Sequence, residues 1–481
     1  MADFAEALAT PLSGLPALTP TGEGRAVAVL PFVNASADPE NEYVSDGMTD
    51  EVISALANLP GLRVASRTSV FALKGRREDV RTIGALLGVS VVLEGTVRKS
   101  GDRLRITAQL TDVQDGRLLW SERYDRDDCN IFAIQDEIAR ALAERLRSDL
   151  LGEVAAPLPR RTTANLVAYN LYLKGRYAWN KRTAEGISEA IRLFEQAIEE
   201  DPQYALAHTG LADAYALHVD YRAAPVTEGM RQARMQAEKA ISLDERLAEA
   251  HTSLGWVTFI HDWDWVRAGR EFQRAIELNP RYATARQWHA WYLTAMGRLG
   301  EAVAEAHRAV DLDPASVSIR RTLGWLYCIA RQPDQAAAVA QRALVMNPEA
   351  QETYVILGIA EEQAGRFDTA RAALGEAQSL SPEDTHVMVC QARLAMRAGH
   401  PEEARAIAAR VRGLDRERYV SPTDLAKLAI ALGEPDLAFE AIAKARAEHR
   451  GWLTYLRVDP LFDPIRGDPR FAVLLKELKL D

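Results

Sequence analysis

The sequence predicts a small α/β domain with a mixed sheet, followed by an all-α superhelix of stacked helix pairs. Three observations favour this fold class. Prolines recur at equal intervals in the second half of the chain, and apolar and polar residues alternate between positions 91 and 124. The change from one sequence pattern to the other falls near position 150. At 481 residues the chain exceeds the usual size of one hydrophobic core, so two or more domains are expected.

The repeat period is carried by whole segments and not by the prolines alone. Each proline follows a helix ending of one type, AIELNP, AVDLDP, ALVMNP or AQSLSP, because proline stops a helix. Small residues keep the same register. A period of about 34 residues is typical of the tetratricopeptide repeat, a helix–turn–helix unit that gains a core by stacking on its neighbours. The residues in register are Pro280, Pro314, Pro348 and Pro382, with the pairs Ala302/Ala309, Ala336/Ala343 and Ala370/Ala377.

About eight repeats are expected over residues 168–450, one of them with an insertion around Asp220–Gly229. Residues 451–481 are expected to cap the superhelix, with a helix over Phe471–Leu480 that covers the last apolar face. Together these units predict a tetratricopeptide-repeat superhelix whose main product is a binding surface.

Residues 25–150 lack the repeat and are predicted to form the α/β domain, between a disordered leader at 1–24 and a linker at 151–167. Asp79 can cap a helix that stops at Gly88. From Val91 the period switches to two, and turns at Lys99–Asp102 and Asp115-Gly116 separate three strands. The expected elements are strand Ala26–Phe32, helix Thr49–Leu59, strand Leu62–Thr68, helix Val80–Leu87, three strands ending at Tyr124, and helix Ile131–Leu146.

The amino-acid sequence of this domain resembles that of a known family. The runs AVAVLPFVNASADPENEYVSDGMTDEVISAL, GLRVASRTSVFALKG, GVSVVLEGTVRKSGDRLRITAQLTD and WSERYDRD are similar to the TolB-like amino-terminal domain, which in bacteria often precedes tetratricopeptide repeats. The repeat segments YLKGRYAWNKRT, HDWDW and LRVDPLFDPIRGDPRF are typical of the same proteins. The resemblance implies a regulatory protein of a family often attached to adenylate cyclase or winged-helix domains. Only the short leader at 1–24 precedes the domain, so neither output module is expected on this chain.

Composition excludes several classes of function. The net charge of −10 and the pI of about 5.6 disfavour a general nucleic-acid binder, which needs a basic footprint. Cys129, Cys328 and Cys390 lie far apart, without metal-like pairing, and indicate a reducing compartment. No apolar run reaches membrane-spanning length, and the first residues do not read as a signal peptide. A cytoplasmic protein without a membrane span is expected.

The catalytic templates are also missing. The sequence holds no phosphate-binding loop, no dinucleotide fingerprint, no metalloprotease or C-x-x-C motif and no nucleophile elbow. Asp46 and Asp50 lie near a helix start, where the helix dipole explains negative charge. We therefore expect no catalytic site, no cofactor and no metal. An enzyme with unfamiliar chemistry in the α/β domain stays open as a third class, which a nucleotide turnover assay would address.

A column of aromatic residues is the sharpest candidate site. In tetratricopeptide repeats the first helix of each unit lines the concave groove, and its ninth residue is tryptophan in three successive units. Tryptophan replaces the asparagine that a carboxylate clamp would need there. A second interpretation is that these tryptophans pack between neighbouring helices. The predicted partner-binding residues are Trp256, Ile260, Trp291, Trp325, Ile329, Ile359 and Arg393.

These observations predict a non-enzymatic interaction scaffold or regulatory protein in bacterial signalling, which binds a protein or peptide in the groove of its repeats. The alternative is the regulatory half of a split adenylate cyclase or transcription regulator, whose output domain lies on another chain. Oligomerisation stays open.

Overall fold

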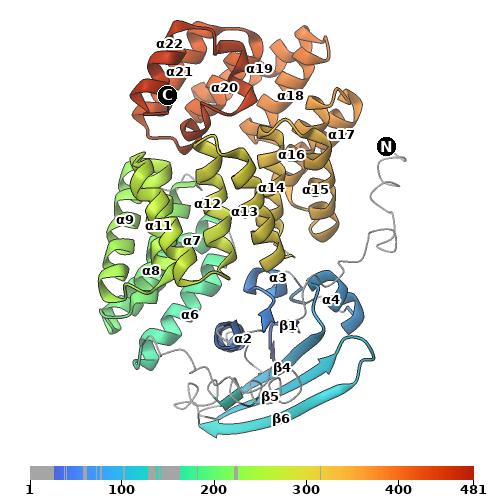
Figure 1. The fold of residues 1–481 in the computed structure, drawn as a ribbon, viewed down its shortest axis with the longest axis vertical. Coiled ribbons are helices and arrows are strands. Elements are labelled where there is room, and N and C mark those ends of the chain that lie inside the picture. The colour runs from blue at the N-terminus through green and yellow to red at the C-terminus, as the bar shows by residue number, and fades with distance from the viewer. Residues whose placement is uncertain are drawn as a thin grey trace.

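The computed structural model describes residues 26–480 except 37, 39–40, 58–61, 72, 76–77, 101–102, 128–136, 139–140, 142–162, 181–182, 221–225 and 315. The expected leader, most of the helix Ile131–Leu146 and most of the linker lie outside the described residues, as does part of the predicted insertion. Figure 1 shows two parts, a sheet domain and a long superhelix of stacked helices above it.

The amino-terminal domain is built on a mixed sheet, as the sequence predicted, and the short strand β2, which was not expected, brings it to six strands. The strand order is β3-β1-β4-β5-β6, and β2 pairs with β4. β1 lies parallel to β3 and β4, whereas β4, β5 and β6 form an antiparallel meander. The strands are β1 (Ala26–Val29), β2 (Val33–Asn34), β3 (Arg63–Val64), β4 (Val91–Ser100), β5 (Arg103–Asp112) and β6 (Leu118–Asp127).

Helices cover both faces of this sheet near β1. Helix α2 (Glu42–Ala57) buries Met48, Val52 and Leu56 against one face, and α4 (Val80–Leu87) buries Ile83 and Leu87 against the other. Asp79 caps α4 and Gly88 ends it, which confirms the predicted bounds.

Several predicted elements of this domain were wrong in extent. The first strand, expected over Ala26–Phe32, ends at Val29, and the last strand, expected to end at Tyr124, continues to Asp127. The strand expected over Leu62–Thr68 is limited to β3, because Ser66 turns the chain: its hydroxyl accepts the amide of Ser69, and helix α3 (Arg67–Phe71) follows. The helix expected to begin at Thr49 begins at Glu42, where an acidic side chain suits the positive helix end.

The rest of the described chain is dominated by consecutive antiparallel helix pairs, in which each first helix packs on its own partner and on the next pair. The helices before the four periodic prolines end two residues earlier, as expected for a proline stop. The pairs are α6 (Leu166–Asn180) with α7 (Ala184–Glu200), α8 (Ala205–Asp220) with α9 (Val226–Leu243), α10 (Ala248–Val257) with α11 (Trp265–Leu278), α12 (Ala283–Ala295) with α13 (Leu299–Leu312), α14 (Val317–Ile329) with α15 (Pro333–Met346), α16 (Gln351–Gln363) with α17 (Phe367–Leu380), α18 (Thr385–Arg397) with α19 (Pro401–Glu417), and α20 (Pro422–Leu432) with α21 (Pro435–Ala447).

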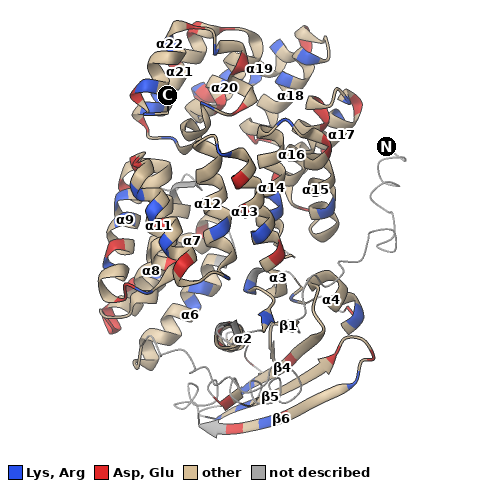
Figure 2. Cartoon of the chain, viewed as in Figure 1, with Lys and Arg blue, Asp and Glu red and all other residues tan. Residues whose placement is uncertain are grey.

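The small-residue columns lie where the helices touch. Ala302, Ala336 and Ala370 and their partners seven residues on are 0 % exposed. A methyl group at these positions lets two helix backbones approach closely, so the periodic alanines are a packing requirement. Basic and acidic residues are interspersed along the helices (Figure 2).

The carboxy-terminal segment does more than cover the last pair. It comprises the 3-10 helices η5 (Gly451–Tyr455) and η6 (Pro460–Ile465) and the helix α22 (Pro469–Glu477). It belongs to one apolar cluster with residues of α10, α11, α20 and α21, so the end of the chain contacts the third repeat as well as the eighth. The indole Nε1 of Trp265 in α11 donates to the carbonyl of Leu478 at 3.0 Å. Within the described residues no helix is long and apolar enough to cross a bilayer.

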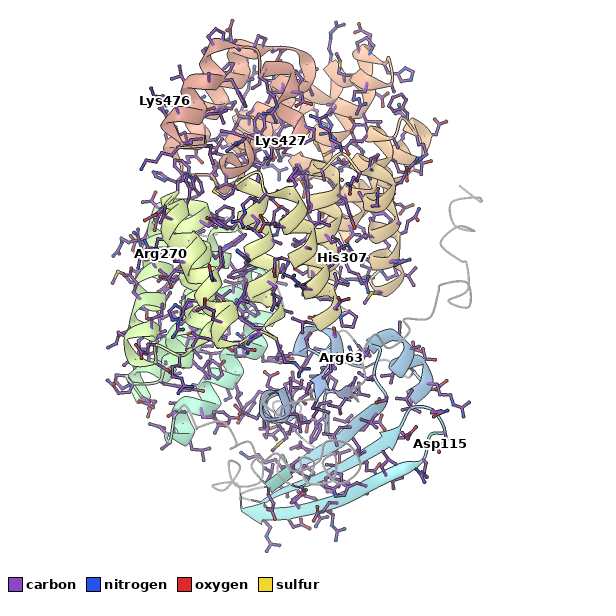
Figure 3. All side chains as sticks on the ribbon, viewed as in Figure 1. Arg63, Asp115, Arg270, His307, Lys427 and Lys476 are labelled. Atoms are coloured by element: carbon purple, nitrogen blue, oxygen red, sulfur yellow. The ribbon has the colours of Figure 1, made fainter. Side chains whose placement is uncertain are left out.

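Among the described residues, the sheet domain contacts the repeats at α6, after the end of α13, and at Met346 of α15, which packs against the apolar cluster of β1 and α4. α2 packs on α6, where Gly47 faces Leu173. The hydroxyl of Ser69 in α3 donates to the buried carboxylate of Asp313, which follows α13. Figure 3 shows Arg63 at this boundary, whereas the β5–β6 turn that carries Asp115 points away from the repeats.

Candidate binding site on the concave face

The predicted column divides into two environments. Its residues all lie on first helices or directly after them, but the carboxy-terminal segment covers one half and walls a cavity at the other. Trp256, Ile260 and Trp291 belong to the covered half. Trp325, Ile329, Ile359 and Arg393 line the cavity. Their binding role stays a prediction.

In the covered half the protein supplies its own contacts. The ring of Trp291 lies 5.3 Å from that of Tyr455 in η5, and its Nε1 donates to the Thr322 hydroxyl at 3.2 Å. The ring of Trp256 lies 4.8 Å from that of Trp288, with the two ring planes tilted at 33°. Ile260 is 8 % exposed and faces Gly451. A partner that lay along this half of the column would have to displace the carboxy-terminal segment.

The local backbone explains part of this arrangement. Residues Thr258–Asp262 form a single π-helical turn after α10, which buries Phe259 and His261. Asp264 caps α11 by accepting the amide of Arg267, and Trp265 packs inward at 9% exposed. The pKa of His261 falls to about 4, because burial disfavours its charged form and His449 and Arg234 add repulsion.

The other half of the column lines a cavity of about 470 Å³ between α14, α16, α18, α20 and η6. Its walls are largely apolar, and the carboxy-terminal segment closes one side. The volume lies within the range of ligand sites in proteins. Lining residues include Trp325, Ile329, Ile359, Val389, Met396 and Ile430, and from the carboxy-terminal segment Asp459, Pro460, Leu461, Asp463 and Pro464.

A buried ion cluster crosses the cavity wall. The carboxylate of Glu362 is 1 % exposed and accepts two bonds from Arg393 Nε, both at 3.0 Å, and one from its Nη2 at 2.7 Å. Arg397 Nη1 adds a bond at 3.2 Å. Burial works against the charge on Arg393, but Glu362 raises the pKa of the guanidinium above its usual value. The cluster holds α16 and α18 in fixed register.

Other polar atoms of the lining are less satisfied. Gln363 Oε1 and His386 Nδ1 are buried and have no hydrogen-bond partner among the described atoms. The ammonium of Lys427, labelled in Figure 3, lies 4.9 Å from the ring of Trp452. Burial raises the pKa of the Cys328 thiol to about 12 and that of Cys390 to about 11, so both thiols are protonated near neutral pH. No group of three His, Cys, Asp or Glu that could hold a metal occurs in the described part of the chain.

The turns between paired helices hold a feature that the sequence interpretation missed. Once in each repeat from the third to the eighth, one residue adopts a left-handed conformation with φ between 54° and 82°. Four of these residues are glycines, which adopt it without strain. Trp263 and Arg331 occupy the same position at a cost of roughly 1 kcal/mol each. The glycines are Gly297, Gly365, Gly399 and Gly433.

Both exceptions contact the carboxy-terminal part of the chain. Trp263 stacks on His449 with ring centroids 4.8 Å apart, and His449 Nδ1 lies 3.0 Å from the carbonyl oxygen of His261. Arg331 pairs with Asp463 at 2.6 Å. The regular spacing of the glycines is visible in the sequence, so the two replacements could have been found there, but their contacts could not.

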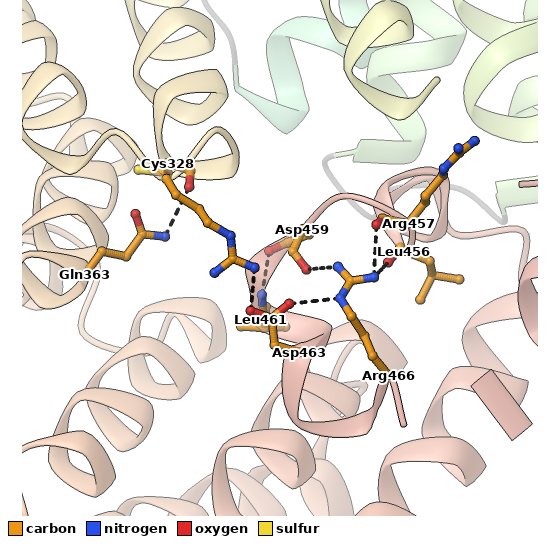
Figure 4. Close-up of polar contacts among 9 residues, drawn as sticks. Cys328, Gln363, Leu456, Arg457, Asp459, Leu461, Asp463 and Arg466 are labelled. Carbon is orange, nitrogen blue, oxygen red and sulfur yellow. Dashed lines mark hydrogen bonds and ion pairs between the residues drawn. The ribbon is translucent and has the colours of Figure 1, made fainter. Parts of the chain in front are cut away.

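The turn that contains Asp463, the partner of Arg331, is held together by its own hydrogen bonds. Arg466 donates to the carbonyls of Leu456, Arg457 and Asp459 and pairs with Asp463 at 2.8 Å (Figure 4). Burial raises the pKa of the Asp463 carboxyl, but the bonds from Arg466 and Arg331 outweigh it and hold the pKa below its ordinary value. Asp459 in turn caps η6 by accepting the amide of Leu461.

Models of known families match segments in both parts of the chain. Residues 23–141 match the second domain of HilA/YgeH-like transcriptional regulators. Residues 172–227, 321–385 and 361–421 match tetratricopeptide repeats. The repeat prediction is thus confirmed, whereas a TolB-like domain is not among these findings.

Two relatives show related sequence over part of the chain. "Putative adenylate cyclase 3" of Rhizobium meliloti (strain 1021) is 38% identical over 229 residues, which are 47% of this chain and 39% of that protein. "Transcriptional regulator HilA" of Salmonella typhimurium (strain LT2) is 26% identical over 133 residues, 28% of this chain and 24% of that protein. The chain thus spans well under half the length of these curated relatives.

Solved structures with a similar helical arrangement include a tetratricopeptide repeat protein from Parabacteroides merdae. It has a TM-score of 0.40 and 16% identity, and the match covers 56% of this chain and 98% of that one. The findings together describe a chain that joins a domain similar to the second domain of HilA-like regulators to a run of tetratricopeptide repeats.

Proposed function

We propose that this protein is a non-enzymatic interaction scaffold or regulatory protein of bacterial signalling, and that it holds a segment of a partner protein in the cavity between α14, α16, α18 and α20. The observation that carries the proposal is the cavity itself. Four of the seven predicted binding residues line it, and it combines an apolar wall with a fixed ion cluster.

The chemistry of the walls suits a peptide. Trp325, Ile329 and Ile359 offer apolar contact for a partner side chain. Buried aromatic residues are frequent anchors of binding energy, and a rigid pocket lowers the entropic cost of association. The unsatisfied Gln363 Oε1 and His386 Nδ1 can pair with backbone amides or polar groups of an incoming segment.

The covered half of the column has a different role in this proposal. Trp256, Ile260 and Trp291 form part of the core that fixes the carboxy-terminal segment. That segment then provides one wall of the cavity. The full set of predicted residues thus contributes to one site, four by lining it and three by holding its wall.

Site-specific crosslinking tests the proposal. A photoreactive phenylalanine analogue at position 396 in the cavity lining is expected to capture one or a few proteins in the native cell. The same analogue at position 266 on α11, which is 68% exposed outside the cavity, is the matched control. Trp325→Ala should abolish capture from position 396. Identical captured proteins at both positions, or capture unaffected by Trp325→Ala, would contradict the proposal.

The second candidate is the regulatory half of a split adenylate cyclase or transcription regulator. The relative named putative adenylate cyclase and the match to a HilA-like domain are compatible with it. In that case crosslinking from position 396 or from the sheet domain should capture a cyclase or a DNA-binding protein. We also propose a cytoplasmic location and a sensing or docking role for the amino-terminal sheet domain, without direct contact to nucleic acid.

A further inference from the structure

We propose that the ion pair between Arg331 and Asp463 is a gate on the cavity, and that access for a partner segment is controlled by release of the carboxy-terminal turn. The proposal rests on the proposed function, since it concerns regulation of the same site. Both residues line the cavity, and they come from different elements, Arg331 from the α14–α15 turn and Asp463 from η6.

The backbone at Arg331 is the first observation. Its position is occupied by glycine in the preceding repeat and in the three repeats that follow. An arginine with φ of 58° costs backbone strain that glycine avoids. The strained residue places a cation beside the cavity, where it reaches a carboxylate 132 positions further along the chain.

The second observation is that the ion pair between Arg331 and Asp463 is exposed and therefore weak. The Arg331 side chain is 63% exposed and that of Asp463 is 38% exposed. Exposed ion pairs contribute little to stability and are weakened by salt. The contact can therefore open without unfolding the repeats, while Trp291, Tyr455 and the rest of the apolar cluster keep the segment attached.

The bracing of the turn is the third observation. Arg466 donates hydrogen bonds to three carbonyls within residues 456–459 and also pairs with Asp463. The turn therefore keeps its shape when the ion pair between Arg331 and Asp463 breaks. The gate then moves as a unit. A carboxylate on an incoming partner competes with Asp463 for Arg331 and favours the open state.

The alkylation rate of two buried thiols measures opening of the gate and needs no partner. Cys328 and Cys390 line the cavity and are 1% and 3% exposed. In the full chain with Cys129 replaced by serine, alkylation by iodoacetamide should be slow. Arg331→Asn removes the cation and retains a residue that tolerates the left-handed conformation. It should accelerate alkylation by about two- to fivefold, the size expected for an exposed pair.

Matched variants separate the gate from general loosening. Arg446→Gln removes another exposed ion pair of the same segment, that with Glu477, away from the cavity, and should leave the rate unchanged. Arg331→Lys should restore slow alkylation. High salt should accelerate alkylation of the wild type and leave Arg331→Asn unaffected.

Equal rates in wild type and Arg331→Asn, or the same salt response in both, would overturn the gate. The two proposals fail separately. A normal gate with no partner captured from position 396 removes the proposed function, and partner capture with an insensitive alkylation rate removes the gate alone.

Discussion

At the scale of single residues, Trp291 fits two roles, because a tryptophan at this position could contact a partner or pack in the hydrophobic core. Its indole packs on Tyr455 and bonds to Thr322, both within the chain. We expect Trp291→Ala to lower the free energy of unfolding by about 3 kcal/mol, because it leaves a cavity under η5. Urea denaturation measures this. Val266→Ala, at an exposed site on α11, should change it by less than about 0.5 kcal/mol.

The opposite result would restore the groove interpretation of Trp291. If the stability of Trp291→Ala matched that of the wild type and crosslinking from position 396 failed, the tryptophan would bind the partner directly and the packing seen here would not be its main role.

His261 gives a prediction on pH. Its pKa in the folded protein is about 4, below the ordinary value near 6.5, because burial, His449 and Arg234 disfavour the charged ring. Below pH 6.5 the unfolded chain therefore binds a proton that the folded chain refuses. This group's contribution to stability is present at neutral pH and is lost as pH falls from about 6.5 towards 4, by about 2 kcal/mol at about pH 5.

The measurement is urea denaturation of the wild type and of His261→Gln at neutral pH and near pH 5. The wild type should lose more stability than the variant over this interval. Parallel losses in the two proteins would mean that His261 titrates normally in the folded state.

At the scale of elements, two helical glycines separate packing from conformational entropy. A Cβ at Gly375 in α17 would meet no atom within 4 Å, so Gly375→Ala should stabilise the protein by about 0.5–1 kcal/mol. A Cβ at Gly358 in α16 would lie 2.7 Å from Leu374 Cγ, so Gly358→Ala should destabilise. Thermal unfolding of both variants checks the sign. A gain at both sites would show that α16 and α17 are more loosely packed than described.

The turns between helices are the second lesson at this scale. A turn glycine at the same position of successive repeats keeps the helix pairs in the same geometry. Where Trp263 and Arg331 replace it, the turn acquires a side chain that reaches the carboxy-terminal part of the chain. The repeat is therefore locally strained at the places where it makes long-range contacts.

At the scale of the whole molecule, the sheet domain and the carboxy-terminal segment both bind the superhelix. The sheet domain contacts the repeats at Leu173 and Asp313, and the carboxy-terminal segment joins the third repeat to the eighth. Repeats that interact only with sequence neighbours unfold in steps, whereas such closure couples distant repeats. The coupling predicts a sharper transition than an open array would show.

The repeats should still fold without the sheet domain. A fragment of residues 163–481 keeps Thr163 and Asn165, whose side chains cap α6 and bond to the end of α7. We expect it to be strongly helical by circular dichroism, with a melting temperature lower by roughly 2–4 °C for each kcal/mol of interface lost. An aggregated or unfolded fragment would mean that the α/β domain is an essential cap.

Local patterns along the chain specify the classes of structure and their order. Val91 to Tyr124 alternate because one face of an antiparallel meander is buried, and the prolines recur once per repeat because each helix pair must stop where the next begins. These are local requirements, and they repeat, so a single chain displays them. The same periodicity placed Trp256, Trp291 and Trp325 on one side of the superhelix.

Tertiary structure alone decided which part of that side stays open. The superhelix curls until residues as distant in sequence as Trp265 and Leu478 touch, and no local pattern records the curvature that brings them together. The curvature therefore packs the half-buried Trp291 against Tyr455 and leaves Trp325 beside a cavity. It also makes Arg331, one exposed cation among many, the partner of Asp463. The physical reason is that small rotations between neighbouring repeats add up over the whole array, so the sum is fixed by every interface at once.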